Sequence, residues 1–280
     1  MFEVNFKDFN LKNTFENGQC FRFNRYKDGY LGIAGQNVIY IVQDGEKFFI
    51  EGVSKKTFED VFVPLFDLKR DYAEIISSFK AEENLLSAIE YGKGMRIMAQ
   101  DRWETLFSFI ISQNNNIARI KTIIERICLK YGTPIEFDNT IFYSFPTAKQ
   151  LENVTEQDYA ALGCGYRAKY LQQMVKTYLA GEIDLNKIAK MEYSQAKKEL
   201  TLYLGIGPKV ADCVLLFGLN FYSAFPVDTW IKKVMEALYL KRKATKEEIS
   251  VCANEKFGEY AGIAQQYLFY YARENKLKGL

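Results

Sequence analysis

The chain has 280 residues, of which 48% are hydrophobic and 26% are charged, so it is long enough for a sizeable core and, we expect, for two domains. The formal net charge at pH 7 is only +2, so any binding of nucleic acid must come from a local basic patch. The sequence contains no histidine, which excludes Ser-His-Asp triads, Cys-His nucleophiles, histidine-ligated zinc and histidine proton shuttles.

The cysteines and the apolar segments exclude further classes of protein. Five cysteines are scattered along the chain, which fits a reducing compartment and gives neither zinc spacing nor four closely spaced iron–sulfur ligands. No window approaches the ~18 uninterrupted apolar residues of a membrane span, and the chain opens on a polar stretch rather than an apolar signal segment. We therefore expect a cytoplasmic protein with no membrane contact and no iron–sulfur cluster.

Residues 1–94 are predicted to form a mixed domain built on a sheet. From residue 2 to about residue 52, short runs with β-type alternation are separated by KDG and DGE turns, which predicts an antiparallel meander. Farther on the apolar period lengthens, and the segments 71–80 and 84–91 are typical of amphipathic helices. A break at YGKG marks the expected domain boundary.

Residues 95–280 are predicted to form an all-α domain, which makes the protein α+β overall. Gly132 and Gly181 follow two of the predicted helices and are expected to be left-handed C-caps. The TEQD stretch from Thr155 to Asp158 is expected to be a capping box. Helical spacing of apolar residues occurs in the segments 102–112, 117–132, 166–181, 193–204, 209–219, 229–240, 245–258 and 264–275.

The stretch LGIGPKVADC joins two of the predicted helices by a tight glycine turn. Gly205 and Gly207 permit backbone torsions that other residues avoid, and they leave amide N–H groups bare where the second helix begins. Pro208 suits the first turn of that helix. A helix start with free amides is a candidate phosphate site. The alternative is a plain corner between two helices.

A second motif, FPVDTW, follows this hairpin. Pro226 stiffens its entry, and Asp228 is placed as the N-cap of the next helix. The glycine turn, Lys209 and a Pro-Val-Asp at this spacing together resemble the helix-hairpin-helix DNA glycosylases, in particular their bifunctional, lysine-bearing branch. The resemblance implies that the Lys209 amine attacks the sugar of a damaged nucleotide and forms a Schiff base, while Asp228 stabilises the positive charge of the sugar.

Further motifs extend the resemblance along nearly the whole chain. NGQCFRF, FSFIISQNNNIARI, LGCGYRAKYL, GIGPKVADC, PVD and FGEYAGIAQQYLF are similar to stretches that occur in this order in the 8-oxoguanine DNA glycosylases. That family flips 8-oxoguanine out of the duplex, excises it opposite cytosine and cleaves the abasic strand by β-elimination. The resemblance thus implies a DNA glycosylase and AP lyase whose partner is double-stranded DNA containing 8-oxoguanine, and we expect a monomer.

The resemblance assigns four residues to the extruded base. Gly18 matches the residue whose backbone carbonyl accepts the N7–H that distinguishes 8-oxoguanine from guanine. Phe269 matches the ring that stacks on the base, Gln265 the amide that reads its Watson–Crick edge, and Cys213 the residue on its other face. Gln265 and Phe269 lie four residues apart, as do Lys209 and Cys213, so each pair shares one face of its helix. The alternatives are core packing and, for Gly18, an ordinary turn.

Other residues match the family's contacts to the duplex and to the orphaned cytosine. Asn114 matches the residue that fills the gap left by the base. Arg119 and Arg167 match the arginines that hydrogen-bond the cytosine, and Tyr166 matches the aromatic side chain beside it. The alternatives are a polar loop for the NNN stretch and an exposed helix start for the Tyr-Arg pair.

The sequence departs from the family after the PVD motif, where the family commonly has a histidine that contacts phosphate. Thr229 and Trp230 follow instead, so we expect the phosphate contacts near Asp228 to be rearranged. The chain also lacks long targeting tails, which suggests a compact prokaryotic, nucleoid-associated form. The family implies that no cofactor is required and that a structural Na⁺ or Ca²⁺ ion is held by hairpin carbonyls, here those of Thr201, Tyr203 and Ile206.

Three alternatives to this function stay open. The first is a glycosylase for another oxidised base, against which NGQCF and AQQYLF argue. The second is a non-catalytic hairpin module that binds DNA, which would need neither a base pocket nor the combination of Lys209 and Asp228. The third is a purely structural helical protein, for which we would expect no affinity for DNA.

Overall fold

A five-stranded antiparallel sheet forms the N-terminal part of the chain. The computed structural model describes residues 1–79 and 82–275. The strand order is β1-β5-β4-β3-β2, so four strands form the predicted meander and β1 joins its far edge beside β5. The strands are β1 (Phe2–Asn5), β2 (Phe23–Tyr26), β3 (Gly29–Ala34), β4 (Asn37–Asp44) and β5 (Lys47–Glu51).

Aromatic side chains fill the core of this sheet domain. Phe15 stacks on Phe23 with ring centroids 4.5 Å apart, and Phe9 stacks on Phe48 at 5.1 Å. Such pairs add to the large apolar area that each ring buries. Since Phe15 and Cys20 are both buried in this core, the turn between them, which carries Gly18, is fixed at its edge. The short helices around it are α1 (Leu11–Phe15), α2 (Lys55–Thr57), the π-helix η1 (Phe58–Phe62) and α3 (Val63–Leu65).

The rest of the described chain is mainly helical, which confirms the predicted α+β class. The helix predicted over 193–204 ends at Leu200, and the segment 229–240 divides into α13 and a π-helix. Residue 80, the last of a predicted helix, lies outside the described residues. The helices are α4 (Tyr72–Ser78), α5 (Glu83–Tyr91), α6 (Arg102–Ile111), α7 (Ile117–Tyr131), α8 (Glu156–Ala161), α9 (Arg167–Leu179), α10 (Leu185–Ile188), α11 (Tyr193–Leu200), α12 (Pro208–Gly218), α13 (Thr229–Val234), η2 (Met235–Leu240), α14 (Lys246–Phe257), η3 (Gly258–Tyr260) and α15 (Ala261–Asn275).

Two features of the helical part differ from the sequence-based expectation. A small hairpin, β6 (Pro134–Phe137) and β7 (Thr140–Tyr143), interrupts the helices. Gly132 is not a left-handed cap: its φ is −76°, and a Cβ there would lie 2.1 Å from the Ser144 carbonyl oxygen, so the glycine permits close approach of the hairpin. By contrast, Gly181 has φ +72°, as predicted.

The capping box predicted at the start of α8 is confirmed. The Thr155 hydroxyl oxygen accepts a hydrogen bond from the Asp158 amide at 3.2 Å, and the Asp158 carboxylate accepts one from the Thr155 amide at 3.0 Å. The aspartate therefore performs the role that glutamate usually has in this motif.

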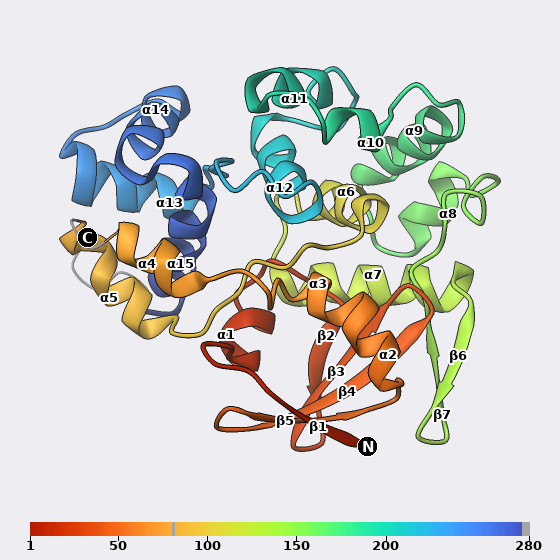
Figure 1. Ribbon diagram of the computed structural model, residues 1–280. Coiled ribbons are helices and arrows are strands. Elements are labelled where there is room, and N and C mark those ends of the chain that lie inside the picture. The colour runs from red at the N-terminus through yellow and green to blue at the C-terminus, as the bar shows by residue number, and fades with distance from the viewer. Residues whose placement is uncertain (80–81, 276–280) are drawn as a thin grey trace.

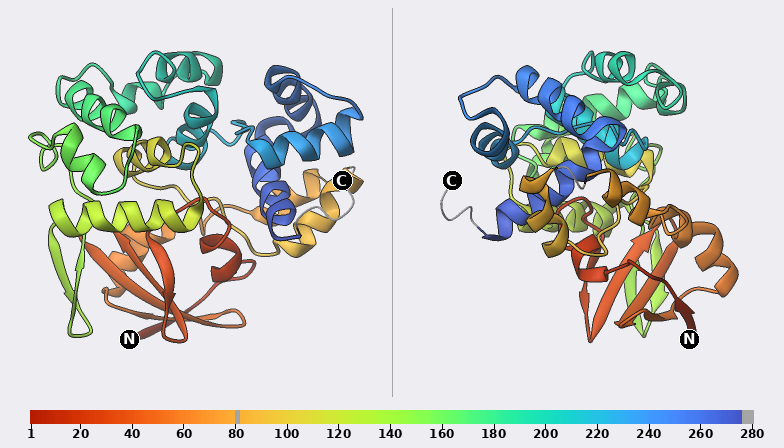
Figure 2. Two further views of the ribbon diagram at one scale, coloured as in Figure 1. Left: turned by 180° about the vertical axis from the view of Figure 1, so that it is seen from behind. Right: turned by 60° about the vertical axis from the view of Figure 1, so that its left-hand side comes forward.

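The helices form two groups above the sheet (Figure 1). Helices α8 to α11 lie on one side of α12, and α13 to α15 lie on the other; Figure 2 shows α7 running between the sheet and the helices. Helices α4 and α5, which precede residue 94, lie beside α15, and Tyr72 and Leu85 belong to the same buried core as Leu268. Within the described ranges, no helix has the length and apolar content that crossing a membrane requires.

Candidate active site

The glycine turn between α11 and α12 needs glycine at one of its two positions. Gly205 has φ +87°, and a Cβ there would lie 2.7 Å from the Tyr170 ring. Gly207 has φ −84° and ψ 173°, which any residue can adopt, and a Cβ there would meet nothing within 4 Å. The expectation of special torsions is thus right for Gly205 and wrong for Gly207. The structure leaves open space beside Gly207, where the amides of α12 begin.

Buried polar contacts hold the hairpin in place. Asp212 on α12 accepts hydrogen bonds from Lys197 at 2.8 Å and from the Tyr193 hydroxyl at 2.7 Å, both on α11. Burial raises the pKa of the Asp212 carboxyl, although the Lys197 ammonium opposes this shift. From the other side, the Gln113 side-chain amide donates to the Gly205 carbonyl at 2.9 Å. The turn is therefore fixed to both of its helices and to the loop after α6.

Lys209, the second residue of α12, is half-buried and lies beside an aromatic ring. Its Nζ is 5.4 Å from the centroid of Phe109, within range of a cation–π interaction. Cys213 follows one turn later and is buried. Burial raises the pKa of the Cys213 thiol to about 11, with the Lys209 charge as the largest opposing effect. The thiol is therefore protonated at neutral pH.

Asp228 caps the helix that faces the hairpin. Its carboxylate accepts a hydrogen bond from the Ile231 amide at 2.8 Å, which confirms the predicted N-cap of α13. Burial raises the pKa of the Asp228 carboxyl; the Ile231 hydrogen bond and the charge of Lys209 oppose this shift. The carboxylate and the lysine thus act on each other across a shared space.

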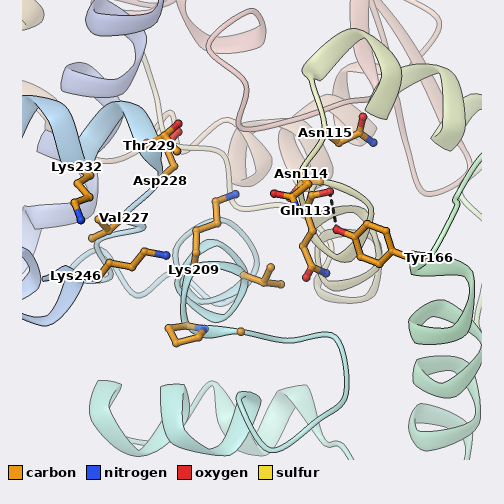
Figure 3. A pocket seen from close by; sticks show the side chains of 14 residues that line it. Gln113, Asn114, Asn115, Tyr166, Lys209, Val227, Asp228, Thr229, Lys232 and Lys246 are labelled. Atoms are coloured by element: carbon orange, nitrogen blue, oxygen red, sulfur yellow. Dashed lines mark hydrogen bonds between the residues drawn. The ribbon is translucent and has the colours of Figure 1, made fainter.

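That space is a cavity of about 490 Å³, open to solvent, between α12, α13 and the loop after α6 (Figure 3). The Lys209 side chain extends between Asp228 on one side and Asn114 on the other. The wall of this cavity includes Gly207 and Pro208 from the hairpin and Tyr166 from the start of α9. A cavity of this size is typical of ligand-binding sites.

A second, smaller cavity of about 60 Å³ adjoins the first, since Lys209 and Asp228 line both. The structure brings to it all four residues assigned to the base, Gly18, Cys213, Gln265 and Phe269. Its volume has room for a few water molecules and is narrow for a purine. Entry of a base therefore requires a lining side chain to move.

Gly18 and Gln265 give this small cavity a close main-chain wall and a buried polar acceptor. Gly18 has φ +91°, and a Cβ there would lie 2.9 Å from Ile117 and 3.4 Å from the Phe269 ring, so a side chain does not fit. The Gln265 amide nitrogen donates to the Pro226 carbonyl at 3.2 Å. Its oxygen is buried with no partner among the described residues. A buried acceptor without a donor is costly unless a ligand supplies one.

The residues assigned to the orphaned base lie around the loop after α6. Asn114 is exposed at its tip with φ +44°, and Tyr166 is 52% exposed. Arg167 is only 4% exposed: it donates to the carbonyls of Gln113 and, at 3.0 Å, of Asn114. Arg119 is exposed and donates to the Gly163 carbonyl at 3.4 Å. In this structure Arg167 therefore supports the loop, and contact with a base requires it to leave these carbonyls.

The residues assigned to a cation lie in the turn before α12. The Tyr203 carbonyl accepts a hydrogen bond from the Ile206 amide at 3.1 Å. In residues 1–79 and 82–275, no cluster of three or more His, Cys, Asp or Glu side chains is placed to hold a metal. A cation at the hairpin would consequently depend on main-chain oxygens, such as those of Thr201, Tyr203 and Ile206.

Sequence reasoning missed several residues of the site. Phe109 contacts Lys209, and Gln113 connects the NNN loop to the hairpin. Lys232 and Lys246 line the larger cavity from α13 and α14. Gln113 directly precedes a motif that was singled out, so its place in the sequence was a usable signal. The two lysines stand among other lysines and arginines and carried no such signal.

Comparison with known proteins agrees with this geometry. The family model described as "8-oxoguanine DNA glycosylase, N-terminal domain" matches residues 1–106, and "HhH-GPD superfamily base excision DNA repair protein" matches residues 107–258. A probable N-glycosylase/DNA lyase of Methanothermobacter thermautotrophicus is 32% identical over 245 residues, 80% of this chain and 78% of that protein. An N-glycosylase/DNA lyase of Arabidopsis thaliana is 31% identical over 279 residues, 91% of this chain and 75% of that protein.

A solved structure is similar over the whole chain. It is that of the Clostridium acetobutylicum 8-oxoguanine glycosylase/lyase in complex with double-stranded DNA containing cytosine opposite 8-oxoguanine. It is 41% identical, has a TM-score of 0.94, and the match covers 99% of both chains. With the two family models, this similarity shows that the chain belongs to the 8-oxoguanine DNA glycosylases of the helix-hairpin-helix base excision repair superfamily.

Proposed function

We propose that this chain excises 8-oxoguanine opposite cytosine and then cleaves the strand through a Schiff base on Lys209. Glycosylase and AP lyase activity follow from the family to which the chain belongs. One observation carries the proposal for this chain: Lys209 and Asp228 line the same small cavity as the four candidate base-binding residues. A reactive amine and a base reader therefore share one space.

The chemistry needs only residues of this chain. The neutral Lys209 amine attacks C1′ of the extruded nucleotide, and the bond to N9 breaks, so the base leaves with its electron pair and takes up a proton. The nitrogen lone pair then expels O4′, which takes up a proton, so the sugar ring opens to a protonated imine between C1′ and Nζ. Loss of a C2′ proton then expels the 3′ phosphate. The Asp228 carboxylate faces the positive charge that develops on the sugar as the base departs.

The base pocket offers hydrogen-bond acceptors to the N–H groups of the lesion and side chains to its two faces. The Gly18 carbonyl would accept the N7–H of 8-oxoguanine and repel the N7 lone pair of guanine. The Gln265 oxygen, buried with no partner among residues 1–79 and 82–275, would accept from the N–H groups of the Watson–Crick edge. Phe269 and Cys213 would enclose the two faces of the base. The Phe269 ring is half-buried, and we propose that it shifts when the base enters.

The residues around Asn114 would serve the opposite strand. Asn114 and Tyr166 are exposed beside the larger cavity, in position to fill the gap and to press against the orphaned base. Arg119 and Arg167 would then hydrogen-bond cytosine, which offers acceptors that fit guanidinium groups. For Arg167 this includes a rotation away from the Gln113 carbonyl.

The proposal extends to the setting of the enzyme. We expect a monomer that acts on double-stranded DNA in a prokaryotic cytoplasm, associated with the nucleoid, and requires no cofactor. An Na⁺ or Ca²⁺ ion at the hairpin would be held by the carbonyls of Thr201, Tyr203 and Ile206, because hard cations favour oxygen ligands. When bound, it would stiffen the turn and add positive charge near a phosphate.

Trapping with borohydride tests the proposed function. The protein is mixed with duplexes containing 8-oxoguanine opposite cytosine, 8-oxoguanine opposite adenine, or guanine opposite cytosine, and borohydride reduces any imine to a stable adduct. We expect a covalent protein–DNA band mainly with the first duplex, and none with Lys209→Gln. Salt-sensitive DNA binding without any band would contradict the proposal and favour the non-catalytic module.

A further inference from the structure

Two lysines enter the larger cavity without a role in the reaction described above. Lys232 comes from α13 and Lys246 is the first residue of α14. Figure 3 shows both on the side of the cavity opposite Asn114 and Tyr166, with the Lys209 side chain between the two sides. They line the same cavity as Asp228 and Thr229, where the chain has Thr229 and Trp230 rather than a histidine after the Pro-Val-Asp motif.

A buried carboxylate fixes the relative position of these two lysines. Glu236, one turn after Lys232, accepts a hydrogen bond from the Ala244 amide at 2.9 Å and an ion pair from Lys243 at 3.2 Å. This main-chain hydrogen bond, with the nearby lysines, lowers the pKa of the Glu236 carboxyl. The hydrogen bond ties η2, which continues directly from α13, to the segment that leads into α14, only two residues before Lys246.

The ammonium groups are poorly matched by carboxylates of the protein. In the described part of the chain, no carboxylate oxygen lies within 4 Å of the Lys246 nitrogen. Lys232 is 3.8 Å from a Glu236 oxygen that already accepts the Ala244 amide. The cavity lining holds three lysines and a single carboxylate, Asp228. This wall therefore carries an excess of positive charge that favours an anion.

We infer that Lys232 and Lys246 form a phosphate-binding pair that holds the lesion strand on the side of Lys209 away from Asn114 and Tyr166. The hairpin amides bind one backbone phosphate beside the extruded nucleotide, and the lysine pair binds a neighbouring phosphate. The strand is thus held at two phosphates near C1′. The pair replaces the phosphate contact that a histidine after the Pro-Val-Asp motif would make. This inference rests on the proposed function, since it assumes that the cavity receives a DNA strand.

Salt dependence of binding tests the pair. The probe is a duplex with a tetrahydrofuran abasic analogue opposite cytosine, which the enzyme cannot cleave. Lys232→Gln and Lys246→Gln should each weaken binding by roughly threefold to tenfold and reduce the slope of log Kd against log salt by about 0.9. In the double variant, the slope of log Kd against log salt should fall by about 1.8. Lys233→Gln, next to Lys232 on α13, and Lys256→Gln, at the far end of α14, are matched controls and should keep the wild-type slope.

A neutral phosphate identifies the contact. A methylphosphonate is placed in turn at each phosphate flanking the abasic analogue. At one position, the methylphosphonate should weaken wild-type binding as much as Lys246→Gln weakens binding to the unmodified duplex. The same methylphosphonate should not weaken binding of Lys246→Gln any further. If wild-type slopes persist in both variants while wild type still gives the borohydride adduct, the pair is disproved and the proposed function stands. If wild type neither binds nor is trapped, the proposed function fails.

A role in tuning Lys209 predicts a different result. In that case the single-turnover rate at saturating enzyme would fall and its pH profile would shift, with the salt slope unchanged. Our inference predicts the reverse for the two readouts that separate the roles: the salt slope falls, and the pH profile keeps its position.

Discussion

The two walls of the small cavity are built in different ways. The wall with Lys209 and Cys213 is one helix and its glycine turn, held by the Asp212 contacts and by Gln113. The other wall joins the turn at Gly18 to α15, segments from opposite ends of the chain. The Gln266 amide donates to the Asn17 carbonyl at 3.0 Å, and Arg273 donates to the Glu16 carbonyl at 2.6 Å.

This difference separates chemistry from recognition. In the proposed mechanism, the attacking amine and its carboxylate partner depend on the hairpin and α13, while discrimination of the base depends on the pairing of Gly18 with α15. Each wall has its own supporting contacts. We therefore expect substitutions to damage one function while sparing the other.

The largest effect is expected on the chemical wall. Lys209→Gln removes the nucleophile, and excision and strand cleavage should fall by at least about 10⁴-fold, as when other covalent nucleophiles are removed. Affinity for a duplex with the abasic analogue should change little, because the hairpin amides remain. Single-turnover excision and equilibrium binding measure the two quantities. Loss of binding in parallel with activity would show that the walls are not separable.

Asp228→Asn should reduce excision by about 10²- to 10³-fold, because a charge that stabilises the transition state is lost. Stability should change little, since asparagine also caps helices well and can accept the Ile231 amide. In wild type, the raised pKa of Asp228 means that its carboxylate is protonated, and activity lost, as pH falls through a value above that of ordinary aspartate. This acidic limb of the single-turnover pH profile should be absent from the variant.

On the recognition wall, Phe269→Ala should reduce excision of 8-oxoguanine by about fivefold to 150-fold, the cost of about 1–3 kcal/mol of stacking. Cleavage at a preformed abasic site should be unaffected, because no base has to be held. Tyr271→Ala, which removes another aromatic side chain of α15 outside the cavity lining, is the matched control. Equal losses on the lesion and on the abasic site would contradict a role in base recognition.

The smallest expected effect is on the free energy of unfolding, and it distinguishes the two hairpin glycines. Gly205→Ala should lower the free energy of unfolding by about 1–3 kcal/mol, since φ is +87° and the Tyr170 ring is in the way. Gly207→Ala should cost under about 1 kcal/mol, because its torsions are ordinary and the space is open. The new methyl group should nevertheless weaken DNA binding where a phosphate approaches. Urea unfolding measures the two changes in stability, and parallel binding measurements test the effect on DNA affinity. Equal destabilisation by both substitutions would refute the distinction between Gly205 and Gly207.

Local features of the fold could be predicted from the sequence. The capping box at Thr155, the N-cap at Asp228 and the left-handed glycine at Gly181 depend on a few neighbouring residues. The hairpin of β6 and β7 was missed because its strands have only four residues each and pair mainly with each other. Gly132 was misread because its role is set by the distant Ser144 carbonyl.

The site divides in the same way. The shared helix face of Lys209 and Cys213 follows from helical spacing, whereas their roles, and the link between Gly18 and Phe269, came from resemblance to a family. The burial of Arg167 against the Gln113 carbonyl depends on how two segments far apart in the sequence approach each other. The positions of Lys232 and Lys246 depend on the contact between Glu236 and Ala244. Such tertiary contacts leave no pattern in one sequence.

The most direct test of the account identifies the lysine that carries the nucleotide. Three lysines line the cavity, so a trapped band alone does not show which amine reacts. The wild-type protein is trapped with borohydride on the 8-oxoguanine duplex, digested, and the modified peptide is located by mass spectrometry. We predict that the adduct lies on Lys209. An adduct on Lys232 or Lys246 would contradict both the proposed mechanism and the phosphate-binding pair.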